Sequence, residues 1–219
     1  MTLDCKQMSF AIRSMDLVDS LSLSNIERDA FPTQRPPTPF KRDIHNAKVR
    51  YLVAYKRSEE TQAKPPGNAE KRGALQRVLD RLSGRNPEDT RSDPNTVGYI
   101  GSLYQLDEVH ITAVGVRVAY RGKGIGELLL IAGLELAQLR GAREATLEVR
   151  VSNDVAQSLY RKYAFESKGI RPKYYTDNNE DAMIMTTPDI QSEEYKALLI
   201  SLTQTHNSRH GSSTRDLGE

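Results

Sequence analysis

The sequence predicts a mixed α/β (α+β) fold, in which a central β-sheet is flanked by helices within a single domain. Segments rich in β-branched and aromatic residues alternate with segments that have the apolar spacing of amphipathic helices. Two strand-like segments, 97–104 and 108–116, are separated by a turn as short as that of a β-hairpin. A chain of 219 residues suits one domain with appendages.

The N-terminal part is expected to contain a first strand at 10–13, helical segments between 17 and 30, and a second strand at 50–55. Three prolines within 35–39 exclude a helix there, because proline lacks an N–H donor and fixes its φ angle. A short helix is expected next, at 40–47. The domain therefore begins with two strands and the helices between them.

Residues 57–95 interrupt this pattern and predict a polar insertion. The segment contains prolines at 65, 66, 87 and 94, and within it apolar residues at 75, 78, 79 and 82 repeat with helical spacing. One interpretation is a solvated insertion with a single packed helix. The other is a segment that contacts a substrate or partner.

The C-terminal half continues the alternation. The predicted elements are a helix that begins at 125 and is ended by Gly141, a strand at 145–151, a helix at 154–163, and strands at 165–170 and 182–186. The main domain is therefore expected to cover 8–187. A further amphipathic helix is predicted at 188–203, and the polar residues 204–219 are predicted to form a disordered tail.

Composition excludes several classes of function. The 31 Lys and Arg residues nearly balance 29 Asp and Glu residues, so direct nucleic-acid binding is not expected. The single cysteine, Cys5, excludes an internal disulfide, and the four histidines show no zinc spacing, so no metal is expected. Without a signal region or a run of about 20 apolar residues, the protein is expected to be cytoplasmic and free of the membrane.

The most informative segment is 114–126, where an apolar strand runs into a glycine-rich turn and then a helix. Alternating glycines allow close approach of the backbone to a ligand, and the helix start offers unpaired N–H groups to an anion such as a phosphate. Lys123 is followed by glycine rather than Ser or Thr, which excludes a Walker A loop. The third glycine is misplaced for a dinucleotide-binding loop.

The strand at 145–151 carries the second informative pattern. Strand alternation places Leu147 and Val149 on one face and the charged Glu148 and Arg150 on the other. The following helix delivers Tyr160, so a carboxylate and a phenol are expected to converge on one cleft.

Four segments in this order resemble the motifs of RimI-type N-terminal acetyltransferases of the GNAT superfamily: Arg121–Gly126, Leu147–Asn153, Leu159–Phe165, and Tyr174–Tyr175 with Glu180–Ala182. The resemblance extends over 8–187, with the insertion at 57–95 as its main departure. It implies the GNAT fold, in which a mixed sheet splays open between two parallel strands. It also implies acetyl-CoA as the cosubstrate.

The resemblance assigns residues to the coenzyme. The pantetheine and acetyl group would lie along the strand, the pyrophosphate on the glycine loop, and the coenzyme arm beside the next helix. The residues are Val114, Gly115 and Val116 in the strand, Arg121, Gly122, Lys123, Gly124, Ile125, Gly126 and Glu127 in the loop and helix start, and Asn153.

The resemblance also assigns catalytic and acceptor residues. Glu148 corresponds to a general base and Tyr160 to a general acid, roles that suit an ammonium that loses a proton and a thiolate that gains one. Tyr174 and Tyr175 resemble tyrosines that line a peptide entrance, and Phe31-Pro32 matches a loop of the substrate wall. Each has a structural alternative: an ion pair of Glu148 with Arg150, or simple packing for the aromatic residues.

His110 resembles a histidine found near the catalytic water of archaeal and eukaryotic relatives, although a histidine in a strand more often has only a structural hydrogen bond. The predicted activity is acetyl transfer from acetyl-CoA to the α-amine of a protein N-terminus, and the expected acceptor is a ribosomal protein that begins with alanine. Transfer would be direct, within a ternary complex. The alternatives are a small-molecule amine or a lysine side chain as acceptor, or a non-catalytic coenzyme A-binding module.

Overall fold

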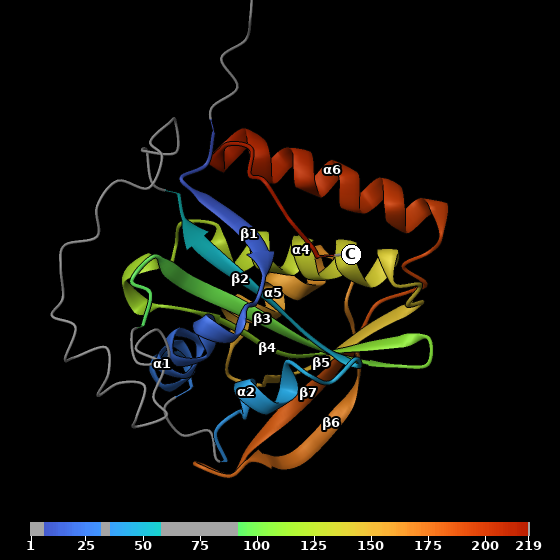
Figure 1. The fold of residues 1–219 in the computed structure, drawn as a ribbon. Helices are drawn as coiled ribbons and strands as arrows, with labels where there is room; N and C mark the ends of the chain where they lie inside the picture. Colours follow the sequence, from blue (N-terminus) through green and yellow to red (C-terminus); the bar gives the residue numbers. More distant parts are fainter. Residues whose placement is uncertain (1–6, 32–35, 58–91, 219) are drawn as a thin grey trace, which may run out of the picture.

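The computed structural model describes residues 7–31, 36–57 and 92–218 (Figure 1). The strands are β1 (Phe10–Ser14), β2 (Val49–Lys56), β3 (Thr96–Gln105), β4 (Glu108–Val116), β5 (Glu144–Arg150), β6 (Glu166–Tyr175) and β7 (Glu180–Thr186). The α-helices are α1 (Ser20–Ala30), α2 (Phe40–Asp43), α4 (Ile125–Leu139), α5 (Asp154–Lys162) and α6 (Glu193–His210), and short 3-10 turns are η1 (Leu17–Asp19) and η3 (Val118–Tyr120).

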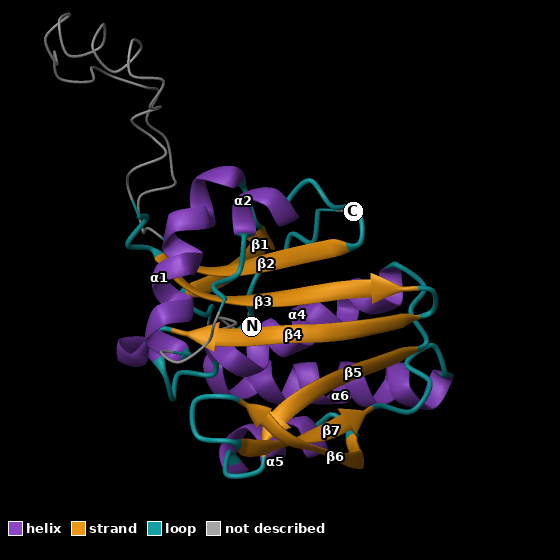
Figure 2. Ribbon diagram, turned by 90° about the horizontal axis from the view of Figure 1, so that it is seen from below, coloured by secondary structure: helices purple, strands orange, loops and turns teal. Residues whose placement is uncertain are grey.

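The strands form one sheet in the order β1-β2-β3-β4-β5-β7-β6, in which only the β4–β5 pair is parallel among the described residues. This parallel pairing ends at Ile111 and Leu147. Beyond that point β4 continues beside β3 and β5 continues beside β7, so the two strands diverge (Figure 2). The predicted mixed, splayed sheet and the predicted β3–β4 hairpin are therefore confirmed.

A β-bulge marks the place where β4 leaves β5. Gly101 pairs with Ala113 and Ser102 pairs with Ile111, which leaves Thr112 as the extra residue of β4. A Cβ atom on Gly101 would lie 2.7 Å from Thr112 Oγ1, so glycine permits the close approach of the two strands.

Helices cover both faces of the sheet: α4, α5 and α6 lie on one face, and α1 and α2 lie on the other (Figures 1 and 2). The predicted apolar stripe of α4 is fully buried, with Leu128 and Leu129 at 0% exposure. Each such leucine contributes about 2 kcal/mol by leaving water. A second, smaller core lies under α1 and α2, where Phe40 packs edge-on against Tyr51 and Tyr99.

The short helix predicted at 40–47 is smaller in the structure, since α2 ends at Asp43. Asn46 explains the difference, because its side-chain oxygen accepts a hydrogen bond from the backbone N–H of Lys48 and forms a turn into β2. The helix predicted within the insertion at 57–95 lies outside the described residues.

The C-terminal prediction is wrong for residues 204–218. Helix α6 continues to His210 instead of ending near 203, and the segment after it lies along the outer edge of β1. Backbone hydrogen bonds run from Ile12 N to Thr214 O and from Asp216 N to Ile12 O. A polar sequence therefore becomes ordered, because it satisfies the exposed backbone groups of an edge strand.

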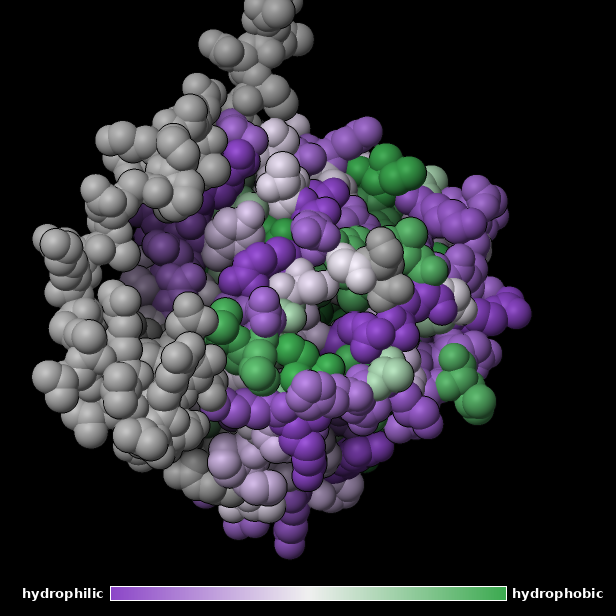
Figure 3. All heavy atoms as spheres, in the orientation of Figure 1, coloured by the Kyte–Doolittle hydropathy of each residue, from purple (hydrophilic) through white to green (hydrophobic). Residues whose placement is uncertain are grey.

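The surface seen in Figure 3 is mostly hydrophilic, with apolar side chains in small separate groups. None of the described helices is long and apolar enough to cross a membrane.

Candidate active site

A cavity of about 760 Å³ lies where β4 and β5 diverge. Its walls are formed by β4, β5, the turn between β6 and β7, α5 and the end of α1. The lining includes seven of the predicted site residues: Phe31, Val114, Glu148, Asn153, Tyr160, Tyr174 and Tyr175. Residues far apart in the sequence are therefore brought to one place by the sheet topology.

Glu148 lies on β5 just beyond the last residue that pairs with β4, and its side chain is only 6% exposed. Its Oε2 atom is 3.0 Å from His110 Nε2 on β4. The sequence left the role of His110 open, and the structure places it directly against the predicted base. The parallel register explains the contact, because His110 pairs with Thr146, two residues before Glu148 on the same face.

The second oxygen of Glu148 is held by a residue that the sequence did not single out. Arg171 of β6 places its Nη1 atom 2.8 Å from Glu148 Oε1, and the arginine side chain is 55% exposed. No local pattern identifies this arginine, because β6 reaches Glu148 only across β7. The alternative pairing of Glu148 with Arg150 is absent, since Arg150 binds Asp177 and Glu180 instead.

These contacts determine the charge of Glu148. The hydrogen bond from His110 has the largest influence on the pKa of Glu148 and lowers it. Burial raises this pKa, and the nearby Arg171 charge lowers it. The net result is a pKa below the usual value. Glu148 is therefore an ionised carboxylate at neutral pH. A carboxylate with a lowered pKa is a weak base when it acts alone.

Tyr160 lies on α5 across the cavity from β4, and it packs against Phe165 at 5.7 Å between ring centroids. Burial raises the pKa of Tyr160 to about 12. Its phenol therefore stays protonated at neutral pH and is able to donate a proton into the cavity.

The glycine loop joins the end of β4 to α4. Gly122 and Gly124 have φ angles of 74° and 78°, a left-handed conformation that favours glycine. Leu128 donates the first hydrogen bond of α4, to Gly124 O. The N–H groups of the three residues before Leu128 consequently have no acceptor within the helix, and a helix start of this kind suits an anion such as a phosphate.

The charged residues around this loop have separate partners. Arg121 Nε donates to Val116 O over 3.3 Å, and Lys123 Nζ lies 5.0 Å from the Tyr120 ring centroid. The carboxylate of Glu127 accepts hydrogen bonds from Lys162 and Tyr163, so it ties α4 to the end of α5. Gly115 and Val116 lie at the end of β4, and Ile125–Gly126 form the first turn of α4; unlike Val114, none of them is among the residues that line the cavity.

Asn153 caps the start of α5, where its side-chain oxygen accepts a hydrogen bond from Ala156 N over 3.1 Å. The same residue lines the cavity. It therefore has the structural role that its position predicts and also faces the space where a coenzyme arm would lie.

Phe31, Tyr174 and Tyr175, which were predicted to contact the acceptor, all line the cavity. Phe31 follows the end of α1, and Tyr174 packs edge-on against Tyr175 with 5.2 Å between ring centroids. Tyr175 Oη lies 3.5 Å from Glu148 O. Pro32 lies outside the described residues.

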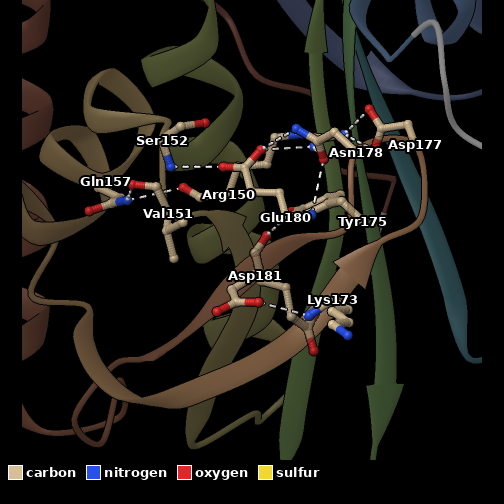
Figure 4. Close-up of polar contacts among 11 residues, drawn as sticks. Arg150, Val151, Ser152, Gln157, Lys173, Tyr175, Asp177, Asn178, Glu180 and Asp181 are labelled. Atoms are coloured by element: carbon tan, nitrogen blue, oxygen red, sulfur yellow. Dashed lines mark hydrogen bonds and ion pairs between the residues drawn. The ribbon is translucent and has the colours of Figure 1, made fainter.

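Arg150 fastens the turn between β6 and β7 to the end of β5 (Figure 4). Its guanidinium binds both oxygens of Asp177 at 2.9 and 3.0 Å and Glu180 Oε2 at 3.0 Å. The same group lies over the Tyr175 ring, 3.9 Å from its centroid. Glu180 in turn accepts a hydrogen bond from Ser152 N over 2.9 Å. This network holds the tyrosine pair in place at the cavity wall.

Within the described ranges, no group of three His, Cys, Asp or Glu side chains is arranged to hold a metal ion.

Residues 21–165 match the sequence model of the acetyltransferase (GNAT) family. The chain is 45% identical over 93 residues to a putative ribosomal protein bS18-alanine N-acetyltransferase of Bacillus subtilis (strain 168), across 42% of this chain and 62% of that protein. It is 40% identical over 100 residues to N-alpha-acetyltransferase RimI of Mycobacterium tuberculosis (strain ATCC 25618 / H37Rv), across 43% of this chain and 61% of that protein. The matched stretch thus spans less than two thirds of these relatives.

The crystal structure of the ribosomal-protein-S18-alanine N-acetyltransferase from Escherichia coli has the same fold, with a TM-score of 0.58. The match covers 82% of this chain and 94% of that chain at 22% sequence identity. The splayed sheet, the glycine loop before α4 and the match over most of the domain lead to one assignment. The chain belongs to the acetyltransferase (GNAT) family.

Proposed function

We propose that this protein transfers an acetyl group from acetyl-CoA to the free α-amine of a protein N-terminus. The observation that carries the proposal is the position of Glu148 and Tyr160 on the walls of one cavity, at the split between β4 and β5. Family membership supports acetyl transfer, and the relatives named as N-terminal acetyltransferases support this class of acceptor.

Acetyl-CoA supplies an activated thioester, and this chain's residues manage the protons. Glu148 draws the acceptor ammonium into the cavity and receives its proton through a water, with His110 holding the carboxylate in position. Tyr160 donates a proton to the departing sulfur. The amine attacks the thioester carbonyl directly, so transfer takes place in a ternary complex without a covalent enzyme intermediate.

An α-amine suits this site better than a lysine side chain. The unperturbed pKa of an α-amine is about 7.7 to 8.0, against about 10.4 for lysine, so a useful neutral fraction already exists at pH 7. Glu148, with its lowered pKa, is a weak base and favours the acceptor that loses its proton more easily. The tyrosine pair and Phe31 provide an apolar entrance for the first residues of a peptide.

The proposed acceptor is a ribosomal protein that begins with alanine, because the Bacillus subtilis relative is named for acetylation of that residue in bS18. Such an acceptor would place the enzyme in the cytoplasm.

An assay with acetyl-CoA and a library of peptides that vary in their first residues tests the proposal. Each peptide is used with a free N-terminus, with a blocked N-terminus, and with an internal lysine replaced by arginine. Acetylation that requires the free N-terminus and survives loss of the lysine is expected. Activity that survives the block would show a side-chain acceptor, and binding of acetyl-CoA without transfer to any peptide, lysine or small amine would show a non-catalytic module.

A further inference from the structure

The C-terminal helix α6 contacts the glycine loop. This helix lies outside residues 21–165, which match the family model, whereas the loop lies within them. Helix α6 runs alongside α4, and its last turns reach the start of α4 (Figure 1). There, His206 Nε2 lies 3.0 Å from Gly124 O. Gly124 is the residue that precedes α4, at the point where the loop becomes a helix.

The chemistry of this contact determines which ring nitrogen carries the proton. A carbonyl oxygen only accepts, so the ring must donate from Nε2. The other nitrogen, Nδ1, is buried and has no hydrogen-bond partner in the described part of the chain. The side chain of His206 is only 1% exposed, and burial lowers its pKa. The imidazole is therefore neutral and donates one hydrogen bond, to the loop.

Hydrogen bonds before and after α6 attach it to α4 and support the position of His206 beside the loop. At its start, Gln191 Nε2 donates to Gln138 O and Ala142 O at the end of α4, each over 2.9 Å. Beyond its end, Arg215 binds both oxygens of Glu135 on α4, at 2.6 and 2.8 Å. The helix and the segment after it thus form a brace along the length of α4.

A second histidine, His210, also packs against the glycine loop. The His210 ring lies 4.9 Å from the His206 ring between centroids. A Cβ atom on Gly124 would lie only 2.7 Å from His210 Cδ2. The two histidine rings therefore pack together against the turn at Gly124.

We propose that His206 is a positioning residue for the acetyl-CoA pyrophosphate, because its hydrogen bond to Gly124 O holds the loop in its phosphate-binding shape. The inference rests on the proposed function insofar as the loop binds acetyl-CoA. It adds that a helix outside the matched family region sets the affinity for the coenzyme. His206 does not touch the reacting atoms, so its effect falls on coenzyme binding and leaves the chemical step unchanged.

Two isosteric amides test this in the full chain. In His206→Gln the amide nitrogen occupies the place of Nε2 and restores the bond, whereas in His206→Asn it occupies the place of the unpartnered Nδ1. The Asn variant should bind acetyl-CoA roughly three- to tenfold more weakly, the effect of one lost hydrogen bond. Its KM for acetyl-CoA should rise equally, with the peptide KM and kcat at saturating acetyl-CoA unchanged. The Gln variant should resemble the wild type.

The affinity for acetyl-CoA is measured by calorimetry, and the Tm by thermal unfolding, for both variants and for the control Ser208→Ala, which changes an exposed residue of α6. Equal affinities of the Gln and Asn variants would overturn the inference, whether both match the wild type or both weaken together. Wild-type protein that binds acetyl-CoA and loses affinity only in the Asn variant, yet acetylates no amine, would contradict the proposed function and still support the inference. Wild-type protein that does not bind acetyl-CoA would overturn both.

Discussion

His110 Nε2 lies 3.0 Å from Glu148 Oε2, and the contact joins β4 to β5 at the point where the two strands separate. With Arg171 on the other oxygen, the carboxylate is held from two sides and kept ionised. This arrangement agrees with the role proposed for Glu148, in which the ionised carboxylate attracts the acceptor ammonium and receives its proton through a water.

Replacement of Glu148 by Gln should lower kcat about 100-fold, since a neutral amide neither attracts the ammonium nor accepts its proton. The affinity for acetyl-CoA should stay close to that of the wild type, because the glycine loop is untouched. Steady-state kinetics and calorimetry check this, with Glu144→Gln as the matched control, an exposed carboxylate on the same strand. Lost coenzyme binding with kcat intact would mean that Glu148 has another role.

Replacement of Tyr160 by Phe should lower kcat roughly 10- to 100-fold, because the leaving thiolate loses its proton donor. The fold should tolerate the change, since the phenyl ring keeps its packing against Phe165. Tyr55→Phe on β2, outside the cavity, is the control. A Tyr160→Phe enzyme that is as fast as the wild type at saturating substrates would remove the phenol from the mechanism.

Replacement of Arg150 by Met should raise the peptide KM about five- to tenfold while the KM for acetyl-CoA stays constant. The reason is that Arg150 holds Asp177 and Glu180 and stacks on Tyr175, so its loss frees the wall that faces the acceptor. Arg143→Met, which breaks an exposed ion pair with Asp189, serves as the control. An unchanged peptide KM would show that the turn keeps its shape without Arg150.

Glu180 should make stability depend on pH in the acid range. Hydrogen bonds from Ser152, with those from Asn178 and Arg150, lower the pKa of Glu180 to about 2, from an ordinary value of 4.5. A lowered pKa stabilises the folded state above pH 4.5, and this contribution is lost as the pH falls toward 2. The Tm difference between the wild type and Glu180→Gln should therefore shrink across that range. A Tm difference that stays constant between pH 4.5 and pH 2 would contradict this role of Glu180.

Alanine at the two left-handed glycines should have unequal effects. Gly122→Ala should cost about 1 kcal/mol of unfolding free energy, from backbone strain alone, because the added Cβ meets open space. Gly124→Ala should cost about 1 to 3 kcal/mol more, because its Cβ collides with the His210 ring. Urea denaturation of both variants measures the difference. Equal losses of unfolding free energy in the two variants would mean that the His210 ring moves away from residue 124 without cost.

Much of the fold was predictable because strands and helices are encoded by local patterns. The stripe that buries Leu128, the alternation that places Glu148 opposite Val149, and the hairpin between β3 and β4 all follow from the spacing of neighbouring residues. The C-terminal segment was mispredicted because its polarity says nothing about the edge of β1, which supplies its hydrogen bonds.

The sequence by itself determined the order of the elements, the glycine turn that precedes α4, and the identity of the carboxylate and phenol proposed for catalysis. The tertiary structure alone decided which groups surround them: His110 and Arg171 around Glu148, Arg150 behind Tyr175, and His206 behind Gly124. The physical reason is that backbone conformation depends on nearby residues. The pKa of a carboxylate and the shape of a binding loop depend on groups that are brought close only by strand register and helix packing.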